Sequence, residues 1–115
     1  MRFPGGSNNK VSANYCYGIM TQLVSEVHNR GYYYFDWNVD SQDASGTSTS
    51  YTKIVNSVLS QANNKNEICV LMHDASAKKT TVQALPKIIE GLIVMGYRFE
   101  PITPETYGFH HSVNN

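Results

Sequence analysis

The stretch Ile68-Cys69-Val70-Leu71-Met72-His73-Asp74 decides how the chain is expected to fold. Its apolar part is too short for a helix and lies between two polar loops, so we predict a buried strand over residues 68–72. Strands buried on both faces are typical of parallel sheets. The run ends in His73 and Asp74, and parallel folds place their active sites at the carboxyl ends of strands. We therefore expect His73 to lie in a functional site.

Three helices and two further strands are predicted around this run. Apolar residues at helical spacing predict helices over residues 15–29, 51–62 and 81–95, with Pro86 near the first turn of the last one. Residues 32–39 are rich in aromatic side chains and are expected to form a strand, as are residues 97–102. The alternation of helix and strand indicates an α/β fold with parallel strands. Because three strands would leave both sheet edges bare, we expect the chain to be half of a larger domain.

Composition excludes several classes of partner. The 115 residues carry nine basic and nine acidic side chains, so the net charge is zero. A nucleic-acid partner would require a basic patch, and no apolar stretch is long enough to span a membrane. The first residues do not resemble a signal peptide. Cys16 and Cys69 are expected to be packed thiols rather than a disulfide or a metal pair.

Three loops contain the residues with candidate chemistry. They hold Arg2, the pair Asp40 and Asp43, and His73. A carboxylate beside an imidazole favours the protonated ring, which suits a general acid. A structural role for His73 and a plain surface position for Arg2 are the open alternatives.

Four motifs, in this order, resemble the carboxyl-terminal half of a polysaccharide deacetylase, the NodB homology domain of carbohydrate esterase family 4. They are Arg2-Phe3-Pro4-Gly5-Gly6-Ser7, Trp37-Asn38-Val39-Asp40-Ser41-Gln42-Asp43, Val70-Leu71-Met72-His73-Asp74, and Ala84-Leu85-Pro86-Lys87-Ile88-Ile89 with Gly96-Tyr97-Arg98-Phe99. The resemblance assigns residues 1–104 to that domain and leaves residues 105–115 as a polar tail. It implies a partial, distorted (β/α) barrel from an enzyme that deacetylates N-acetylglucosamine units in peptidoglycan or chitin-like polymers. Such an enzyme is expected outside the cell or at its surface.

The resemblance also implies a role for five residues. His73 would protonate the leaving amine, and Asp43 would hold and charge His73. Leu71 would line the pocket for the acetyl methyl group. Arg2 would pair with the catalytic-base aspartate, and Gly5 lies in the loop whose backbone N–H helps to bind the oxyanion, a role open to any residue but proline.

The chain departs from the family pattern at two places. The family's Asp-Trp pair is Asp43-Ala44 here, so the aromatic wall of the groove is either lost or supplied by another residue. The Thr-Phe-Asp-Asp and His-x-x-x-His motifs are absent, so the divalent metal, zinc by resemblance, has no ligands in this chain. His110 and His111 are expected in a solvated tail rather than as metal ligands. We therefore expect a fragment that is inactive without the amino-terminal half of the domain.

Two other interpretations remain open. The first is a non-catalytic carbohydrate-binding or interaction domain, with sugar platforms among Tyr32, Tyr33, Tyr34, Tyr51 and Tyr107. The second is a metal-independent hydrolase that uses His73 and Asp43, although neither Ser41 nor Ser76 is an evident nucleophile.

Overall fold

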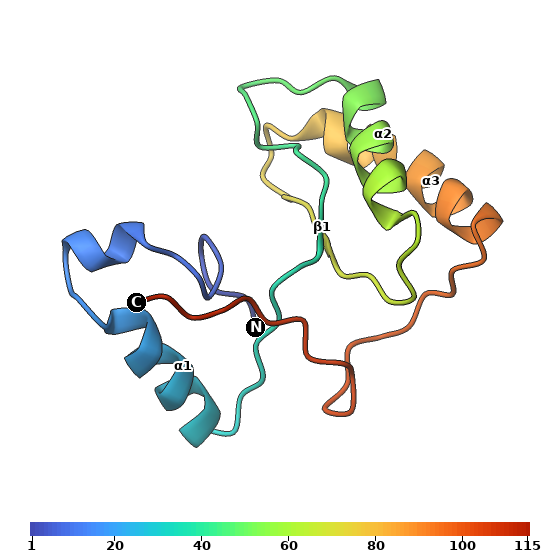
Figure 1. Cartoon of the computed structure of the whole chain (residues 1–115). Coiled ribbons are helices and arrows are strands. Elements are labelled where there is room, and N and C mark those ends of the chain that lie inside the picture. The colour runs from blue at the N-terminus through green and yellow to red at the C-terminus, as the bar shows by residue number, and fades with distance from the viewer. The chain divides into compact units, whose positions relative to one another are not determined.

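The computed structural model describes every residue from 1 to 115. Two compact units divide the chain: unit 1 comprises Met1–Trp37 and Ile102–Asn115, and unit 2 comprises Asn38–Pro101 (Figure 1). Unit 1 contains a short 3-10 helix, η1 (Val11–Asn14), and the helix α1 (Ile19–Asn29). None of the helices combines the length and the apolar character that crossing a membrane requires.

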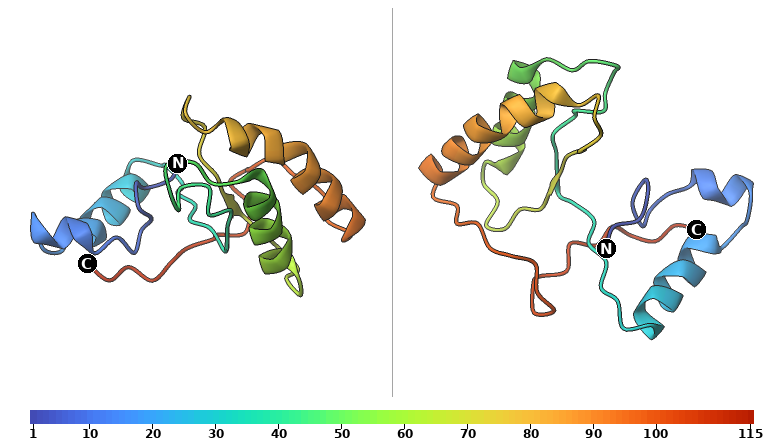
Figure 2. Two further views of the ribbon diagram at one scale, coloured as in Figure 1. Left: turned by 90° about the horizontal axis from the view of Figure 1, so that it is seen from above. Right: turned by 180° about the vertical axis from the view of Figure 1, so that it is seen from behind.

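Unit 2 has a strand–helix–strand–helix order. Its strands β1 (Val39–Asp40) and β2 (Val70–Leu71) pair in parallel, with Val39 opposite Val70 and Asp40 opposite Leu71. The helices α2 (Tyr51–Ala62) and α3 (Lys79–Val94) lie side by side, as Figures 1 and 2 show. The predicted α/β class is therefore confirmed, whereas a barrel is not formed by these elements alone.

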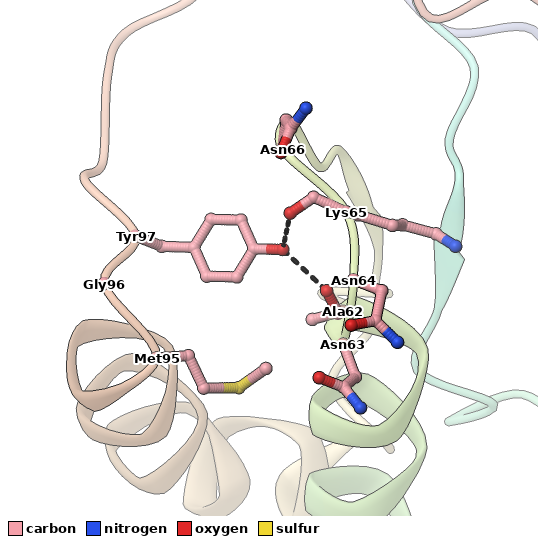
Figure 3. A pocket seen from close by; sticks show the side chains of 8 residues that line it. All are labelled: Ala62, Asn63, Asn64, Lys65, Asn66, Met95, Gly96 and Tyr97. Carbon is pink, nitrogen blue, oxygen red and sulfur yellow. Dashed lines mark hydrogen bonds between the residues drawn. The ribbon is translucent and has the colours of Figure 1, made fainter.

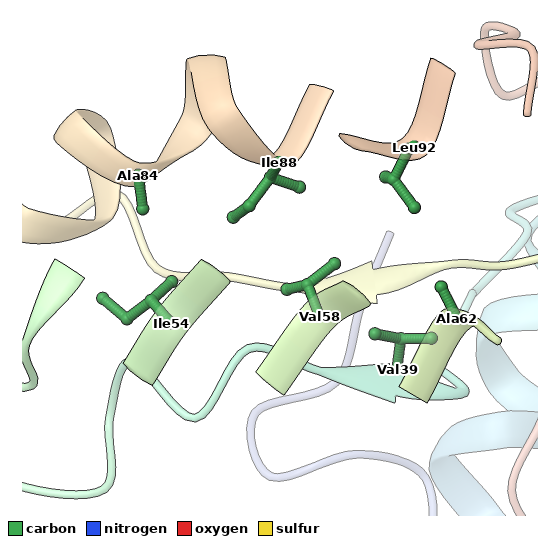
Figure 4. Close-up of a cluster of buried hydrophobic side chains, with 7 residues drawn as sticks. All are labelled: Val39, Ile54, Val58, Ala62, Ala84, Ile88 and Leu92. Carbon is green, nitrogen blue, oxygen red and sulfur yellow. The ribbon is translucent and has the colours of Figure 1, made fainter. Parts of the chain in front are cut away.

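The core of unit 2 lies between α2, α3 and β1 (Figure 4). Its buried members recur every four residues along each helix, so each helix presents one apolar stripe. They are Ile54, Val58, Ala62, Ala84, Ile88 and Leu92, joined by Val39 from β1. Gly91 lets the helices approach, because a Cβ atom there would lie 2.7 Å from Cδ1 of Leu59.

The predicted strands are wrong in length. Residues 32–38 and 97–102 form no strand, and β2 covers two residues that are only half-buried. A strand exists only where its backbone pairs with a neighbouring strand. Within unit 1, the N–H groups of Phe35 and Asp36 instead donate to the carbonyls of Met1 and Phe109, which lie in irregular segments.

Two predicted helix starts also require correction. The helix expected from residue 15 begins at Ile19, after Gly18 at φ 78°, and Cys16 lies exposed in the preceding turn rather than packed. The last helix begins at Lys79, so Pro86 lies inside it and not in its first turn. Proline there removes the N–H that would bond the Val82 carbonyl.

The end of the chain packs within unit 1 and is not a solvated tail. The His111 N–H donates to Oδ2 of Asp36 at 2.8 Å, and the His110 ring stacks on Tyr34 with centroids 4.2 Å apart. The side-chain oxygen of Asn115 accepts the Gly18 N–H at 2.7 Å. The cap that glycine cannot provide at the start of α1 comes from the Asn115 backbone carbonyl, which accepts the Thr21 N–H at 2.7 Å.

Candidate active site

The parallel pairing of β1 and β2 brings His73 and Asp43 together in unit 2. The loops that follow two paired parallel strands leave the sheet at the same edge, and Asp43 follows β1 while His73 follows β2. Nδ1 of His73 lies 2.7 Å from Oδ1 of Asp43, and the His73 backbone N–H donates to Oδ2 at 2.8 Å. The Asp43 side chain is fully buried, whereas 43% of the His73 side chain is exposed.

The loop after β1 is bent so that Asp43 points inward. Gln42 has φ 56°, an uncommon conformation for a residue other than glycine that often occurs at functional sites. The turn is held by Oδ1 of Asp40, which accepts the Gln42 N–H at 2.8 Å, and by the Thr49 hydroxyl, which donates to the Asp43 carbonyl at 3.3 Å. Ser41 is fully buried, so it cannot be an accessible nucleophile for the metal-independent hydrolase.

The first turn of α3 holds Asp43 from the other side. The Thr81 hydroxyl donates to Oδ2 of Asp43 at 2.9 Å, and Nζ of Lys78 donates to the Asp43 carbonyl at 2.7 Å. Sequence reasoning missed both residues. The one available signal was that Thr81 occupies the buried face of a helix that is otherwise apolar there.

These contacts explain why Asp43 is ionised. Burial by itself favours the neutral carboxyl, but hydrogen bonds from the His73 ring, the His73 N–H and the Thr81 hydroxyl outweigh it. Together they hold the pKa of Asp43 below its usual value. An ionised carboxylate only accepts hydrogen bonds, so Nδ1 of His73 carries a proton. Nε2 makes no hydrogen bond within the chain and is the nitrogen available to a substrate.

Leu71, the predicted methyl-pocket residue, lies in β2 two positions before His73. It is half-buried and opposes Asp40 in the ladder, and its carbonyl accepts the Ser41 N–H at 3.2 Å. Leu71, Asp43 and His73 therefore belong to the same unit.

Arg2 lies in unit 1, where the backbone holds its guanidinium group. Nε and Nη2 donate to the carbonyls of Phe35 and Asp36, each at 3.2 Å. The guanidinium carbon lies 5.7 Å from the centroid of the Trp37 ring, close enough for a cation–π contact. Trp37 is half-buried between Arg2 and His111 and is not part of the core of unit 2.

Gly5 lies in unit 1, in a turn closed by a hydrogen bond from the Gly6 N–H to the Phe3 carbonyl. Its φ of 72° and the preceding Pro4 follow the pattern of a type II turn. The positive φ favours glycine at position 5, while the expected role of its backbone N–H stays a prediction. Gly5 is exposed, and its N–H makes no hydrogen bond within the chain.

Unit 1 also contains a buried carboxylate that the sequence did not reveal. Asp36 accepts hydrogen bonds from the N–H and the hydroxyl of Ser7 and from the His111 N–H. Burial favours the neutral form, yet these hydrogen bonds and the nearby His111 ring hold the pKa of Asp36 below its usual value. The His111 ring donates from Nε2 to the Trp37 carbonyl at 2.7 Å. This network ties residues from three segments of unit 1 together.

No group of three or more His, Cys, Asp or Glu side chains lies close enough to hold a metal ion. The residues of this chain therefore do not fit a metal site. Three of the five candidate sugar platforms, Tyr32, Tyr33 and Tyr107, are exposed, while Tyr34 and Tyr51 are half-buried.

A pocket of about 420 Å³ lies where α2 and α3 end (Figure 3). Tyr97 lines it, and its hydroxyl lies within hydrogen-bond distance of the carbonyls of Ala62 and Lys65. Its lining contains none of the predicted site residues. Because Asn66 precedes β2 and His73 follows it, the pocket and the His73–Asp43 pair lie at opposite ends of that strand.

Comparison with known proteins confirms the resemblance seen in the motifs: the chain is a relative of polysaccharide deacetylases. The crystal structure of the catalytic domain of a peptidoglycan N-acetylglucosamine deacetylase from Eubacterium rectale matches all of the chain with a TM-score of 0.93 and 46% identity. The chain spans 51% of that structure, about half its length. No protein-family model matches.

Two curated relatives agree with this match. A peptidoglycan-N-acetylglucosamine deacetylase from Bacillus cereus is 31% identical over 99 residues, which cover 79% of this chain and 35% of that protein. A bifunctional xylanase/deacetylase from Pseudobutyrivibrio xylanivorans is 47% identical over 57 residues, which cover 50% of this chain and 9% of that protein.

Proposed function

We propose that this chain supplies the proton-donating part of a deacetylase that acts on N-acetylglucosamine in a polysaccharide. The observation that carries the proposal is the buried Asp43 carboxylate on Nδ1 of the half-exposed His73. The names of the relatives favour peptidoglycan as the polymer. Because that polymer lies outside the cytoplasm, we propose that the enzyme works outside the cell or at its surface.

The chemistry required is cleavage of an amide. The bond between the acetyl carbon and the amine nitrogen breaks, and the departing nitrogen needs a proton to become a free amine. We assign this proton to Nε2 of His73, while the proton on Nδ1 stays on the hydrogen bond to Asp43. Before transfer both ring nitrogens carry a proton, and Asp43 accepts the hydrogen bond from Nδ1. Acetate and the amine leave, and His73 is neutral until it regains a proton.

The remaining parts of the reaction are assigned by family resemblance. Attack of water on the acetyl carbon needs an activating group and a base, and the chain contains no metal site. We propose that the other half of the complete domain carries the base and the divalent metal, zinc by resemblance, and that this chain alone is inactive. Arg2 would pair with that base, the Gly5 N–H would help to bind the oxyanion, and Leu71 would contact the acetyl methyl group. The chain spans 51% of the solved catalytic domain, and this supports the proposal that a second half completes the enzyme.

A chimera tests the proposal. This chain would replace the matching half of the Eubacterium rectale catalytic domain, and acetate release from an N-acetylglucosamine oligomer would be measured. We expect His73→Asn to lower the rate about 10²–10⁴-fold, which is the usual contribution of a general acid. His28→Asn, a change at an exposed position of α1, is the matched control and should leave the rate unchanged.

Two results would contradict the proposal. A rate for His73→Asn within threefold of the control would mean that His73 is not the acid. A folded chimera that binds the oligomer but releases no acetate would favour the carbohydrate-binding alternative, for which Tyr32, Tyr33 and Tyr107 offer exposed rings. Alanine variants of these tyrosines would then weaken binding.

A further inference from the structure

We propose that Thr81 is a positioning residue for the His73–Asp43 pair: its hydroxyl orients the Asp43 carboxylate so that Oδ1 faces the imidazole. This inference rests on the proposed function for its catalytic meaning. The contacts that support the positioning role all lie within unit 2.

The two oxygens of Asp43 are used differently. Oδ1 faces Nδ1 of His73, whereas Oδ2 accepts from the His73 N–H at 2.8 Å and from the Thr81 hydroxyl at 2.9 Å. A carboxylate can rotate about its bond to Cβ, and two donors on one oxygen prevent that rotation. One of these two donors is the backbone of His73, which is part of the pair. The other is the hydroxyl of Thr81, which belongs to α3. The Thr81 hydroxyl therefore anchors the His73–Asp43 pair to α3.

The burial of Thr81 indicates that its hydroxyl needs the Asp43 carboxylate as an acceptor. Thr81 is 5% exposed and begins a stripe of α3 whose other buried members, Ala84, Ile88 and Leu92, are apolar. A buried hydroxyl destabilises the fold unless it finds a partner. The hydrogen bond to Oδ2 of Asp43 is the one side-chain bond that Thr81 makes. Valine would fill the same space without a donor.

Lys78, the residue just before α3, adds a second tether. Its ammonium group donates to the Asp43 carbonyl at 2.7 Å, so the backbone and the side chain of Asp43 are both held from the start of α3. The β-branched Thr81 side chain is stiff about χ1, which makes it a better fixed donor than the long lysine. Thr81 is therefore the residue that sets the carboxylate's orientation.

The test uses this chain as it exists and reads out the pair by NMR. Thr81→Val keeps the shape and removes the donor, Thr81→Ser restores a donor, and Thr80→Val is the control at a neighbouring threonine that makes no side-chain hydrogen bond. In the parent, Thr81→Ser and Thr80→Val, we expect a slowly exchanging low-field proton on Nδ1 of His73. In Thr81→Val this signal should broaden or vanish, and the titration midpoint of the Asp43 carboxyl should rise towards its usual value.

An unchanged Nδ1 signal and an unchanged Asp43 titration in folded Thr81→Val would overturn the proposal. If Thr81→Val does not fold, Thr81→Ala removes the same donor and is judged by the same two signals. In the chimera, we expect Thr81→Val to lower the rate roughly tenfold, with Thr81→Ser recovering most of it. If His73→Asn loses activity and Thr81→Val does not, the positioning role of Thr81 is rejected and the proposed function is left intact. If neither substitution changes the rate, both the positioning role and the proposed function are rejected.

Discussion

Replacing Asp43 with asparagine should destabilise the chain at neutral pH but much less in acid. The carboxylate accepts hydrogen bonds from Nδ1 and N–H of His73 and from the Thr81 hydroxyl. Asparagine keeps one oxygen and turns the other position into a donor, so at least one of these buried groups loses its acceptor. An unsatisfied buried group costs about 1–3 kcal/mol, and we expect Asp43→Asn to lower the free energy of unfolding by that amount at pH 7.

The pH dependence follows from the direction of the shift. The pKa of Asp43 is lower in the folded chain than its usual value, so the unfolded chain binds a proton at this carboxyl more readily. The stabilisation from Asp43 is therefore complete above the usual carboxyl range, near pH 4, and is lost as the pH falls through the folded-state pKa. The parent should approach the variant in stability as the medium becomes acidic.

Urea unfolding at a series of pH values between 7 and 2 measures this difference. Asp36 also has a lowered pKa, but it is present in both proteins and cancels when they are compared. Asp74→Asn is the matched control, because Asp74 is the exposed acid next to His73 and makes no hydrogen bond. If Asp43→Asn and Asp74→Asn had the same stability at every pH, the hydrogen-bond network around Asp43 would not hold its charge, and the reasoning would be refuted.

Two further predictions concern unit 1. Gly6→Ala should lower the free energy of unfolding by about 1–2 kcal/mol, the usual cost of a left-handed non-glycine residue, because Gly6 has φ 82° and a Cβ atom there would lie 3.0 Å from the Trp37 ring. Gly46→Ala, with open space around it, is the control, and equal melting temperatures would contradict the prediction. Asn115→Ala should lower the free energy of unfolding by about 0.5–1.5 kcal/mol, because it removes the side-chain hydrogen bonds to the Gly18 N–H and the Ser12 hydroxyl. Asn114→Ala should have no effect on urea unfolding, and a matching loss there would argue against a specific role for the Asn115 side chain.

The helices were easier to predict than the strands. The predicted helix over residues 51–62 has the bounds of α2, because the apolar spacing is regular and Ser50 caps it by accepting the Lys53 N–H at 3.3 Å. Strands depend on a neighbour that the sequence does not name. Residues 32–38 have strand-like composition, yet Phe35 and Asp36 bond to the irregular segments of Met1 and Phe109. Composition predicts an extended backbone, whereas the partner decides whether a ladder forms.

The candidate pair was predictable in two different ways. His73 follows from physics, because an ionisable residue after a short apolar run marks the end of a strand at which sites gather. Asp43 was distinguished from Asp40 by family resemblance, and the reason is now visible in the geometry. Asp40 uses Oδ1 to close its own turn on the Gln42 N–H, while Asp43 is buried and faces His73. Local turn chemistry of this kind cannot be ranked from residue type alone.

Thr81 could have been found from the sequence by one further step. Residues 81, 84, 88 and 92 follow the helical spacing of three and four, so the stripe that contains Ile88 and Leu92 also contains Thr81. A hydroxyl at a buried position of an apolar stripe needs an acceptor. The start of α3 comes soon after His73, so the acceptor had to lie near the carboxyl end of β2. Asp43 is the buried carboxylate there. A single polar residue in an apolar helical stripe therefore indicates a buried hydrogen-bond partner close to it. Here that partner is Asp43, the carboxylate that holds the proposed acid His73.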